Sequence, residues 1–162
     1  MSAEKTVKLE LWRFGLPILC FGMIAAISFI EAPLKFQAPG ITIALGLGIG
    51  RLVFFALNIA EAVLLVVLLV LSLWPRATRV AASRLRWLVA LVIVFVLKVA
   101  VIRPPLNART DQVLAGASPG ESPWHYFYIA ADLLTMALLI VLALQAGRAI
   151  LVAAKTSTNS AS

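Results

Sequence analysis

Residues 41–74 read ITIALGLGIGRLVFFALNIAEAVLLVVLLVLSLW, and Arg51 and Glu61 are the only charged side chains in this stretch. A run this apolar is typical of a helix that crosses a lipid bilayer. At ~1.5 Å per residue it would form a helix of roughly 50 Å, whereas the hydrocarbon core of a bilayer is about 30 Å thick. We therefore divide the stretch into a short, glycine-rich interfacial or re-entrant helix at 41–53 and a membrane span at 54–74.

The composition of the whole chain also indicates a membrane protein. Hydrophobic residues make up 62% of the 162 residues and charged residues 13%, and the mean hydropathy is +1.03. A soluble domain is about 25% charged, and a chain this apolar could not cover its surface with polar atoms in water. The net charge of +7 would suggest nucleic acid in a soluble protein. Here the basic residues lie beside apolar runs, so we expect the lipid bilayer as partner and no nucleic acid.

Three further apolar runs complete a predicted all-α fold, a transmembrane four-helix bundle with the short helix between its first two spans. These runs cover residues 14–32, 85–102 and 124–146. Prolines follow the first two of them, and a polar loop is expected at 103–123. A cleaved signal peptide is the alternative for the first run. We predict a single transmembrane domain over 1–154 and a disordered cytoplasmic tail over 155–162.

Basic residues are divided unequally between the two sides of this topology. One side carries Lys5, Lys8, Arg13, Arg76, Arg79, Arg84, Arg86, Arg148 and Lys155, and the other carries Lys35, Arg51, Arg103 and Arg109. Because the side richer in lysine and arginine faces the cytoplasm, we predict a multi-pass protein of the inner (plasma) membrane with both termini cytoplasmic. Trp12, Trp74, Trp87 and Trp124 fall at predicted span ends, as interfacial aromatic residues do.

Away from the span ends, three charged residues lie inside the predicted spans: Glu61, Lys98 and Asp132. A charge near the bilayer centre costs at least ~2.5–3.5 kcal/mol, so such residues face protein or water and find partners. Counted at ~1.5 Å per residue from the outer span ends, all three lie roughly 6–12 Å deep, on three different helices. Fully ionised, the group has one excess negative charge. Either one acid keeps its proton, or Arg51 or Arg103 joins as a further cation.

Two polar stripes extend this pattern. The stripe on the fourth span consists of His125, Tyr128, Asp132 and Thr135. Their i, i+3, i+7, i+10 spacing puts all four side chains on one face of a helix. On the second span, Asn58 lies one turn from Glu61 and forms a looser stripe with Arg51.

These stripes predict a ligand or proton site under the outer surface. Its polar floor would be Glu61, Lys98 and Asp132, and its mouth would be lined by His125, Tyr128, Asn58 and Arg51. The alternative is structural, because buried polar groups in membrane proteins also hold helices together, at about 0.6 kcal/mol per hydrogen bond.

Metal and cofactor chemistry is limited by the residues present. With Cys20 and His125 as the single cysteine and histidine, one chain can form neither a disulfide nor a thiolate–imidazole metal site, and we predict no metal. The cofactor is unknown, although His125 is a candidate axial haem ligand if a second ligand comes from another group or chain. The glycines between 46 and 50 do not complete the dinucleotide-binding G-x-G-x-x-G and instead favour close helix packing.

Four short motifs carry a resemblance that covers most of the chain at the level of layout. They are EAPLKF (31–36), GIGRLVF (48–54), RPPL (103–106) and the WH pair (124–125) that opens the fourth span. The chain resembles a family of small bacterial four-span membrane proteins of unknown function, distantly similar to the copper-resistance D type membrane proteins. The resemblance implies a four-span membrane protein and no particular activity.

Three functional hypotheses follow from these features. The first is a protein that binds or transports a small ligand or proton at the buried polar site, as a homo-oligomer because four helices are few for a transporter. The second is a structural or accessory subunit whose charges pair within a larger membrane complex. The third, less favoured, is a membrane enzyme that acts on a lipid or quinone, with Glu61, His125 or Asp132 as acid or base.

Overall fold

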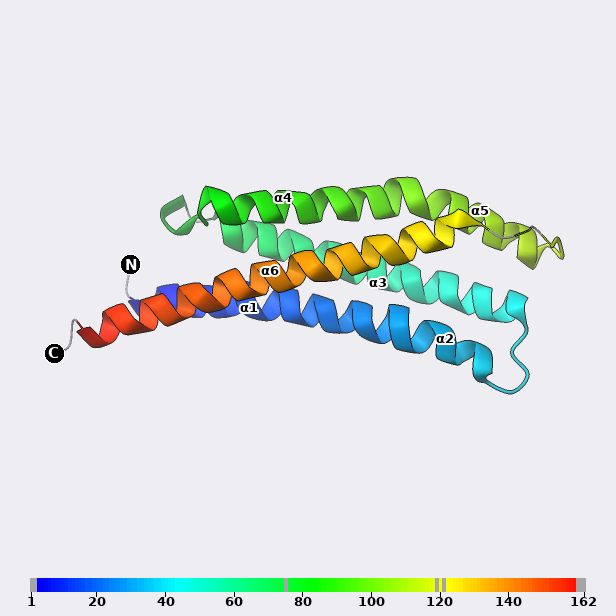
Figure 1. Cartoon of the computed structure of the whole chain (residues 1–162), viewed down its shortest axis with the longest axis horizontal. Helices are drawn as coiled ribbons and strands as arrows, with labels where there is room; N and C mark the ends of the chain where they lie inside the picture. Colours follow the sequence, from blue (N-terminus) through cyan, green and yellow to red (C-terminus); the bar gives the residue numbers. More distant parts are fainter. Residues whose placement is uncertain (1–2, 75, 119, 121, 160–162) are drawn as a thin grey trace.

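The structure is a computed structural model that describes residues 3–74, 76–118, 120 and 122–159, which form an antiparallel bundle of long helices (Figure 1). The first helical run comprises α1 (Ala3–Ile24), the π-helical η1 (Ala25–Glu31), α2 (Ala32–Leu34) and the 3-10 turn η2 (Lys35–Gln37). The second is α3 (Ile43–Leu73). After the 3-10 turn η3 (Arg76–Thr78), the third comprises α4 (Ala82–Leu97), the π-helical η4 (Lys98–Ile102) and α5 (Arg103–Leu114), and the fourth is α6 (Pro123–Asn159).

The two ends of the bundle differ in what they carry. Helix α1 begins and α6 ends at the same end, which we call the terminal end (Figure 1). The opposite end carries α5 and the connection from η2 to α3, and we call it the α5 end. The first and last described helices thus begin and end at the same end of the bundle, as an even number of antiparallel helices requires.

Four helices in the described part of the chain are long and apolar enough to cross a membrane. They are Glu4–Gln37, Ile43–Leu73, Ala82–Leu114 and Pro123–Lys155. Large apolar side chains cover their outer surfaces; on α3, for example, Leu52, Phe55 and Ile59 are exposed. A surface of this kind is stable in contact with lipid and not with water. The prediction of an all-α, four-helix transmembrane bundle is confirmed, and the chain is a multi-pass membrane protein.

The core is made of leucine and other apolar side chains from all four runs. Helix α6 packs along α1 and also against α4, while α3 packs against α1. The buried cluster between them contains Leu16, Cys20, Ile24, Leu57, Leu68, Leu88, Leu91, Leu138, Leu139 and Leu142. Cys20 is therefore a small buried packing residue, in agreement with its place in an apolar run.

The prediction of a separate interfacial or re-entrant helix at 41–53 was wrong. These residues belong to α3, which starts after Thr42, whose hydroxyl accepts a hydrogen bond from the N–H of Leu45 at 3.2 Å. The segment contains no proline to interrupt the helix, and its glycines allow close packing instead of a break. At 31 residues, α3 measures about 46 Å, so it extends beyond the hydrocarbon core or lies tilted in it.

The prediction that prolines end the first and third spans was also wrong. Pro33 and Pro104 lie in the first turn of α2 and α5, where a missing N–H does no harm. In each case a π-helical segment precedes the proline. The residue that follows this segment, Ala32 or Arg103, donates its N–H to a carbonyl five residues back, that of Ile27 or Lys98. The predicted 103–123 loop is consequently helical as far as Leu114.

The predicted domain limits are not tested by the fold, and they stay a prediction. Helix α6 extends to Asn159, into the segment expected to be a disordered tail. The last part of that predicted tail, residues 160–162, lies outside the described residues.

Candidate functional site

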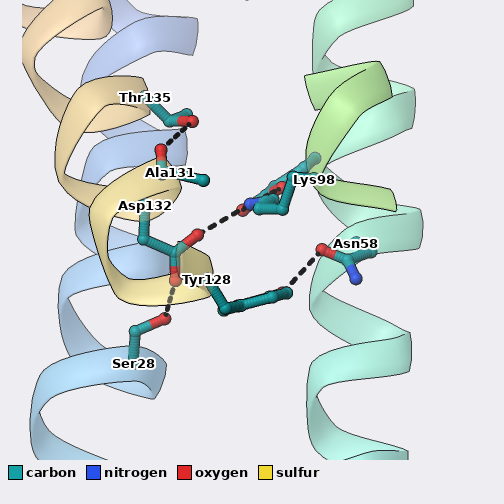
Figure 2. A network of polar contacts seen from close by, with 8 residues as sticks. Ser28, Asn58, Lys98, Tyr128, Ala131, Asp132 and Thr135 are labelled. Atoms are coloured by element: carbon teal, nitrogen blue, oxygen red, sulfur yellow. Dashed lines mark hydrogen bonds and ion pairs between the residues drawn. The ribbon is translucent and has the colours of Figure 1, made fainter. Parts of the chain in front are cut away.

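Lys98 forms the centre of a buried ion cluster. Its Nζ lies 2.9 and 2.6 Å from the two carboxylate oxygens of Glu61 and 2.8 Å from Oδ1 of Asp132. We call these three residues the Lys98 cluster. Figure 2 shows Lys98 and Asp132 reaching toward each other from facing helices. Glu61 comes from α3, Lys98 from η4 and Asp132 from α6, so the cluster joins three of the four helical runs.

The cluster is buried inside the bundle. Lys98 and Asp132 are 0% exposed and Glu61 is 3% exposed. A buried ion pair contributes little net stability, because desolvation offsets the attraction, but removal of one partner is expensive. Such a cluster therefore makes the three helices depend on one another.

Ser28 adds the remaining helical run to this network. Its hydroxyl donates to Oδ2 of Asp132 at 2.7 Å, so both oxygens of that carboxylate are engaged (Figure 2). Ser28 lies in η1 and Lys98 begins η4, so both π-helical segments supply a side chain to Asp132. π-Helical turns are frequent at functional sites because they rotate one side chain out of the α-helical register.

A second polar pair lies beside the cluster. The Tyr128 hydroxyl donates to Oδ1 of Asn58 at 3.1 Å, and the Tyr128 ring centroid lies 5.5 Å from Nζ of Lys98 (Figure 2). The ring of Phe54 packs edge-on against Tyr128, with the centroids 5.4 Å apart. Nδ2 of Asn58 is buried without a hydrogen-bond partner. The Asn58 amide is therefore only half satisfied by the contacts of the described residues.

The charge of the cluster is not balanced by its neighbours. Two carboxylates face one ammonium group, and Arg51 and Arg103 do not join them. Arg51 pairs with Asp111 on α5, while the Arg103 guanidinium lies over the Phe55 ring, 5.1 Å from its centroid. Among the described residues no additional cation contacts either carboxylate. The cluster thus has one excess negative charge unless one carboxyl holds a proton.

A cavity of about 430 Å³ at the α5 end reaches this cluster. We call it the α5-end cavity. Ser28, Tyr128 and Asp132 line its deep part, and basic side chains line the part nearer the helix ends: Lys35, Arg51, Arg103 and His125. The remaining lining is largely apolar and includes Phe36, Phe54 and Leu106. Its volume is within the range of sites for small molecules.

The basic side chains of the cavity are only partly neutralised. Nζ of Lys35 lies 3.3 Å from Oε2 of Glu31 and 5.6 Å from the ring centroids of both Phe36 and Phe54. Arg51 has Asp111 as its partner. For Arg103 no acidic partner is found among the residues that the structure describes, so it is the cation most open to a ligand.

The predicted site residues fall into three groups. Glu61, Lys98 and Asp132 meet directly, and Asn58 and Tyr128 bond to each other beside them. Arg51 and His125 line the α5-end cavity without contacting the Lys98 cluster. Thr135, the last member of the α6 stripe, donates to the carbonyl of Ala131 in its own helix at 2.8 Å (Figure 2).

Sequence reasoning missed Ser28, Lys35 and Arg103 as parts of the site. Ser28 was a lone hydroxyl in an apolar run, and Lys35 and Arg103 were placed outside the spans because prolines were expected to end them. Each of the three residues lies near a proline, and in the structure the helix continues past that proline. This proximity is the feature of the sequence that could have identified them. At the terminal end, a further buried cluster of Glu10, Arg13 and Arg84 was also missed.

No group of three or more potential metal-ligating side chains occurs in the described ranges. His125 is exposed at the cavity, with its ring centroid 6.2 Å from that of Tyr126. The haem hypothesis for His125 stays a prediction.

Comparison of the chain with protein-family models, with curated proteins and with solved structures found no match. The four-span layout that the resemblance implies agrees with the structure. The family itself is not supported by these comparisons. The fold and the site define the class: a four-span integral membrane helical bundle with buried charged pairs and a cavity that reaches them.

Proposed function

We propose that the protein binds a small anionic ligand with an apolar portion in the α5-end cavity and exchanges a proton at the Lys98 cluster. The observation that carries the proposal is that Asp132 belongs both to the α5-end cavity and to the Lys98 cluster. One carboxylate is bonded to Lys98 and also lines the cavity. A molecule in the cavity therefore contacts the ion cluster directly and changes its charge balance.

The ligand class follows from the cavity lining. Aromatic and aliphatic side chains form most of its wall, which suits an apolar portion of the ligand. Lys35, Arg51 and Arg103 lie nearer the helix ends, where they would bind a carboxylate or phosphate.

The proton follows from the charge imbalance. One excess negative charge buried in a bilayer is costly, so the resting cluster holds one proton on a carboxyl group. An anion that enters the cavity adds negative charge near the cluster and favours protonation of the second carboxyl group, which is still ionised. Ligand binding is thus linked to proton uptake, because both act on the same cluster.

The orientation belongs to the proposal as well. The terminal end carries most of the basic residues, so we place it in the cytoplasm and the α5-end cavity on the outer side of the inner membrane. We also propose a homo-oligomer, because four helices provide little room for a transport path within one chain.

Native mass spectrometry after gentle detergent extraction tests ligand binding. Decanoate serves as an anionic probe with an apolar tail, and decanol as its neutral analogue. We expect the wild type to retain decanoate and not decanol, and Lys35→Gln and Arg103→Gln to lose it while the folded yield is kept, because both cations line the cavity. Glu4→Gln is the control, because Glu4 pairs with Lys8 on the exposed surface of α1. Retention of decanoate in both cavity variants would refute the binding proposal.

Proton linkage has its own measurement. In weakly buffered solution, decanoate binding to the wild type should raise the pH, since the protein takes up protons, and Asp132→Asn should abolish this change. The same mass spectra report the oligomeric state. A clean protein with a reproducible protein partner would favour the accessory-subunit hypothesis, and turnover of an added lipid or quinone would favour the enzyme.

A further inference from the structure

A second cavity, of about 540 Å³, lies at the terminal end of the bundle. We call it the terminal-end cavity. It lies between the start of α1, the start of α4 and the end of α6, on the opposite side from the Lys98 cluster. Four arginines line it: Arg13, Arg79, Arg84 and Arg148.

The acid at this cavity is already neutralised. Glu10 is 6% exposed and accepts from Nη1 of Arg13 at 2.5 Å and from Nη1 of Arg84 at 2.8 Å. The other donors of Arg13 are used within the protein. Its Nε donates to the carbonyl of Leu71 at 3.0 Å and its Nη2 donates to the carbonyl of Thr78 at 2.6 Å. The Glu10–Arg13 pair therefore holds α1 to the α3–α4 connection, and Arg84 shares the Glu10 carboxylate with Arg13.

Two arginines and one donor group of a third remain for an external partner. Nη2 of Arg84 is buried and has no acceptor in the protein. Arg79 and Arg148 are exposed at the cavity, and no acidic partner for either is found within 3–74, 76–118, 120 and 122–159. A buried charged donor without an acceptor is costly, so an anion in the cavity would stabilise Arg84 in particular.

The start of α4 adds to this electropositive setting. Ala81 is the N-cap of α4 and provides no side-chain hydrogen bond to its first N–H groups. Ala81, Ser83 and Arg84 all line the cavity, so these N–H groups lie beside it. Free N–H groups at a helix start attract phosphate and other anions.

The bilayer supplies such an anion at this level. Trp12, Trp74 and Trp87 are exposed at the same end of the bundle, where tryptophans mark the lipid headgroup region. We propose that the terminal-end cavity binds the phosphate of an anionic phospholipid headgroup, held by Arg79, Arg84 and Arg148. Basic pockets between helix ends bind acidic headgroups in this way. The inference is independent of the ligand proposed for the α5-end cavity.

Lipid retention tests the proposal. The full chain is reconstituted in nanodiscs with equal amounts of phosphatidylglycerol and phosphatidylcholine of the same chain length, and the lipids that stay bound are counted by native mass spectrometry. We expect the wild type to retain phosphatidylglycerol in preference. The double variant Arg79→Gln, Arg148→Gln should reduce this preference roughly 30-fold, since each basic residue at a membrane surface contributes about 1 kcal/mol. These two arginines make no ion pair with a described residue, so the fold is kept, and circular dichroism verifies it.

Arg86→Gln is the matched control. Arg86 is exposed near the start of α4 and does not line the cavity, so its removal lowers the surface charge and leaves the lipid preference unchanged. An equal loss in Arg86→Gln, or equal retention of both lipids by the wild type, would overturn the proposal. Displacement of the bound lipid by inorganic phosphate would overturn the lipid assignment and identify a free phosphate site.

Discussion

Nζ of Lys98 lies within hydrogen-bond distance of both carboxylate oxygens of Glu61, at 2.9 and 2.6 Å. This two-oxygen contact joins η4 to α3 between side chains that are 0% and 3% exposed. Because Asp132 approaches the same nitrogen from α6, the ammonium group is the only described cation for two acids. The three residues are therefore not equivalent, and their replacement should have unequal effects.

The Lys98→Met variant should be the most destabilising change in the cluster. It leaves two buried carboxyl groups without a cation, and loss of one partner of a buried ion pair costs about 3–5 kcal/mol. Glu61→Gln instead leaves one lysine and one aspartate, which neutralise each other, so a loss nearer ~1–2 kcal/mol is expected. The free energy of unfolding in mixed dodecylmaltoside and dodecylsulfate micelles measures both.

A triple variant provides the control for this comparison. Lys98→Met combined with Glu61→Gln and Asp132→Asn removes all charge from the site. It should be more stable than Lys98→Met alone, because no unpaired carboxyl remains. If the triple variant is as unstable as the single one, shape and not charge accounts for the effect.

Tyr128 and Asn58 should show a measurable coupling energy. Tyr128→Phe removes the 3.1 Å hydrogen bond to Oδ1 of Asn58, whose Nδ2 is already without a partner. A double-mutant cycle with Asn58→Leu isolates the pairwise contribution. We expect about 0.6 kcal/mol, the average for hydrogen bonds between membrane helices, and at most ~1.7 kcal/mol. A coupling energy of zero would mean that the hydrogen bond between the Tyr128 hydroxyl and Asn58 contributes nothing to stability.

Arg13→Gln should destabilise the bundle from its terminal end. Arg13 donates to Glu10 and to the carbonyls of Leu71 and Thr78 and is 5% exposed, so its loss leaves several buried acceptors without a donor. We expect a loss of about 3–5 kcal/mol in the free energy of unfolding. Arg86→Gln, an exposed arginine on α4, should change it by less than ~0.5 kcal/mol. Equal stability of the two variants would contradict the role given to Arg13.

The sequence predicted the four-helix transmembrane bundle because apolar runs and interfacial tryptophans are local signals. It also indicated the depth of Glu61, Lys98 and Asp132, since depth follows from the helical rise. It could not show whether they meet, because the rotation of each helix about its axis is set by packing. The structure shows how each helix is rotated about its axis, and the two π-helical segments contribute to this rotation.

The errors came from residues whose effect depends on context. Prolines were interpreted as helix ends, although a π-helical turn before Pro33 and Pro104 lets the helix continue. The glycines between 46 and 50 were placed in a separate helix, although they belong to α3. The error about the prolines placed Lys35 and Arg103 outside the spans, and for that reason only Arg51 and His125 of the basic cavity lining were anticipated.

Gly46 and Gly48 lie two residues apart in α3 and should respond oppositely to alanine. A Cβ at Gly46 would overlap the ring of Phe36, whereas a Cβ at Gly48 would lie 3.7 Å from Cδ2 of Leu114, an ordinary contact. Gly48→Ala should therefore stabilise the helix by up to ~1 kcal/mol. Gly46→Ala should be about 1–3 kcal/mol less stable than Gly48→Ala, because overpacking offsets the same gain in helix propensity. Unfolding in mixed micelles compares the two directly.

Phe36 provides the test of the cause. If overlap with its ring is responsible, Phe36→Leu combined with Gly46→Ala should recover most of the loss, because the shorter side chain leaves room for the new methyl group. Phe36 also lines the α5-end cavity, so Gly46→Ala should weaken decanoate binding while Gly48→Ala should not. If the double variant recovers no stability, the α3 backbone itself requires a glycine at position 46. The close approach of η2 to α3 would then not explain the presence of Gly46.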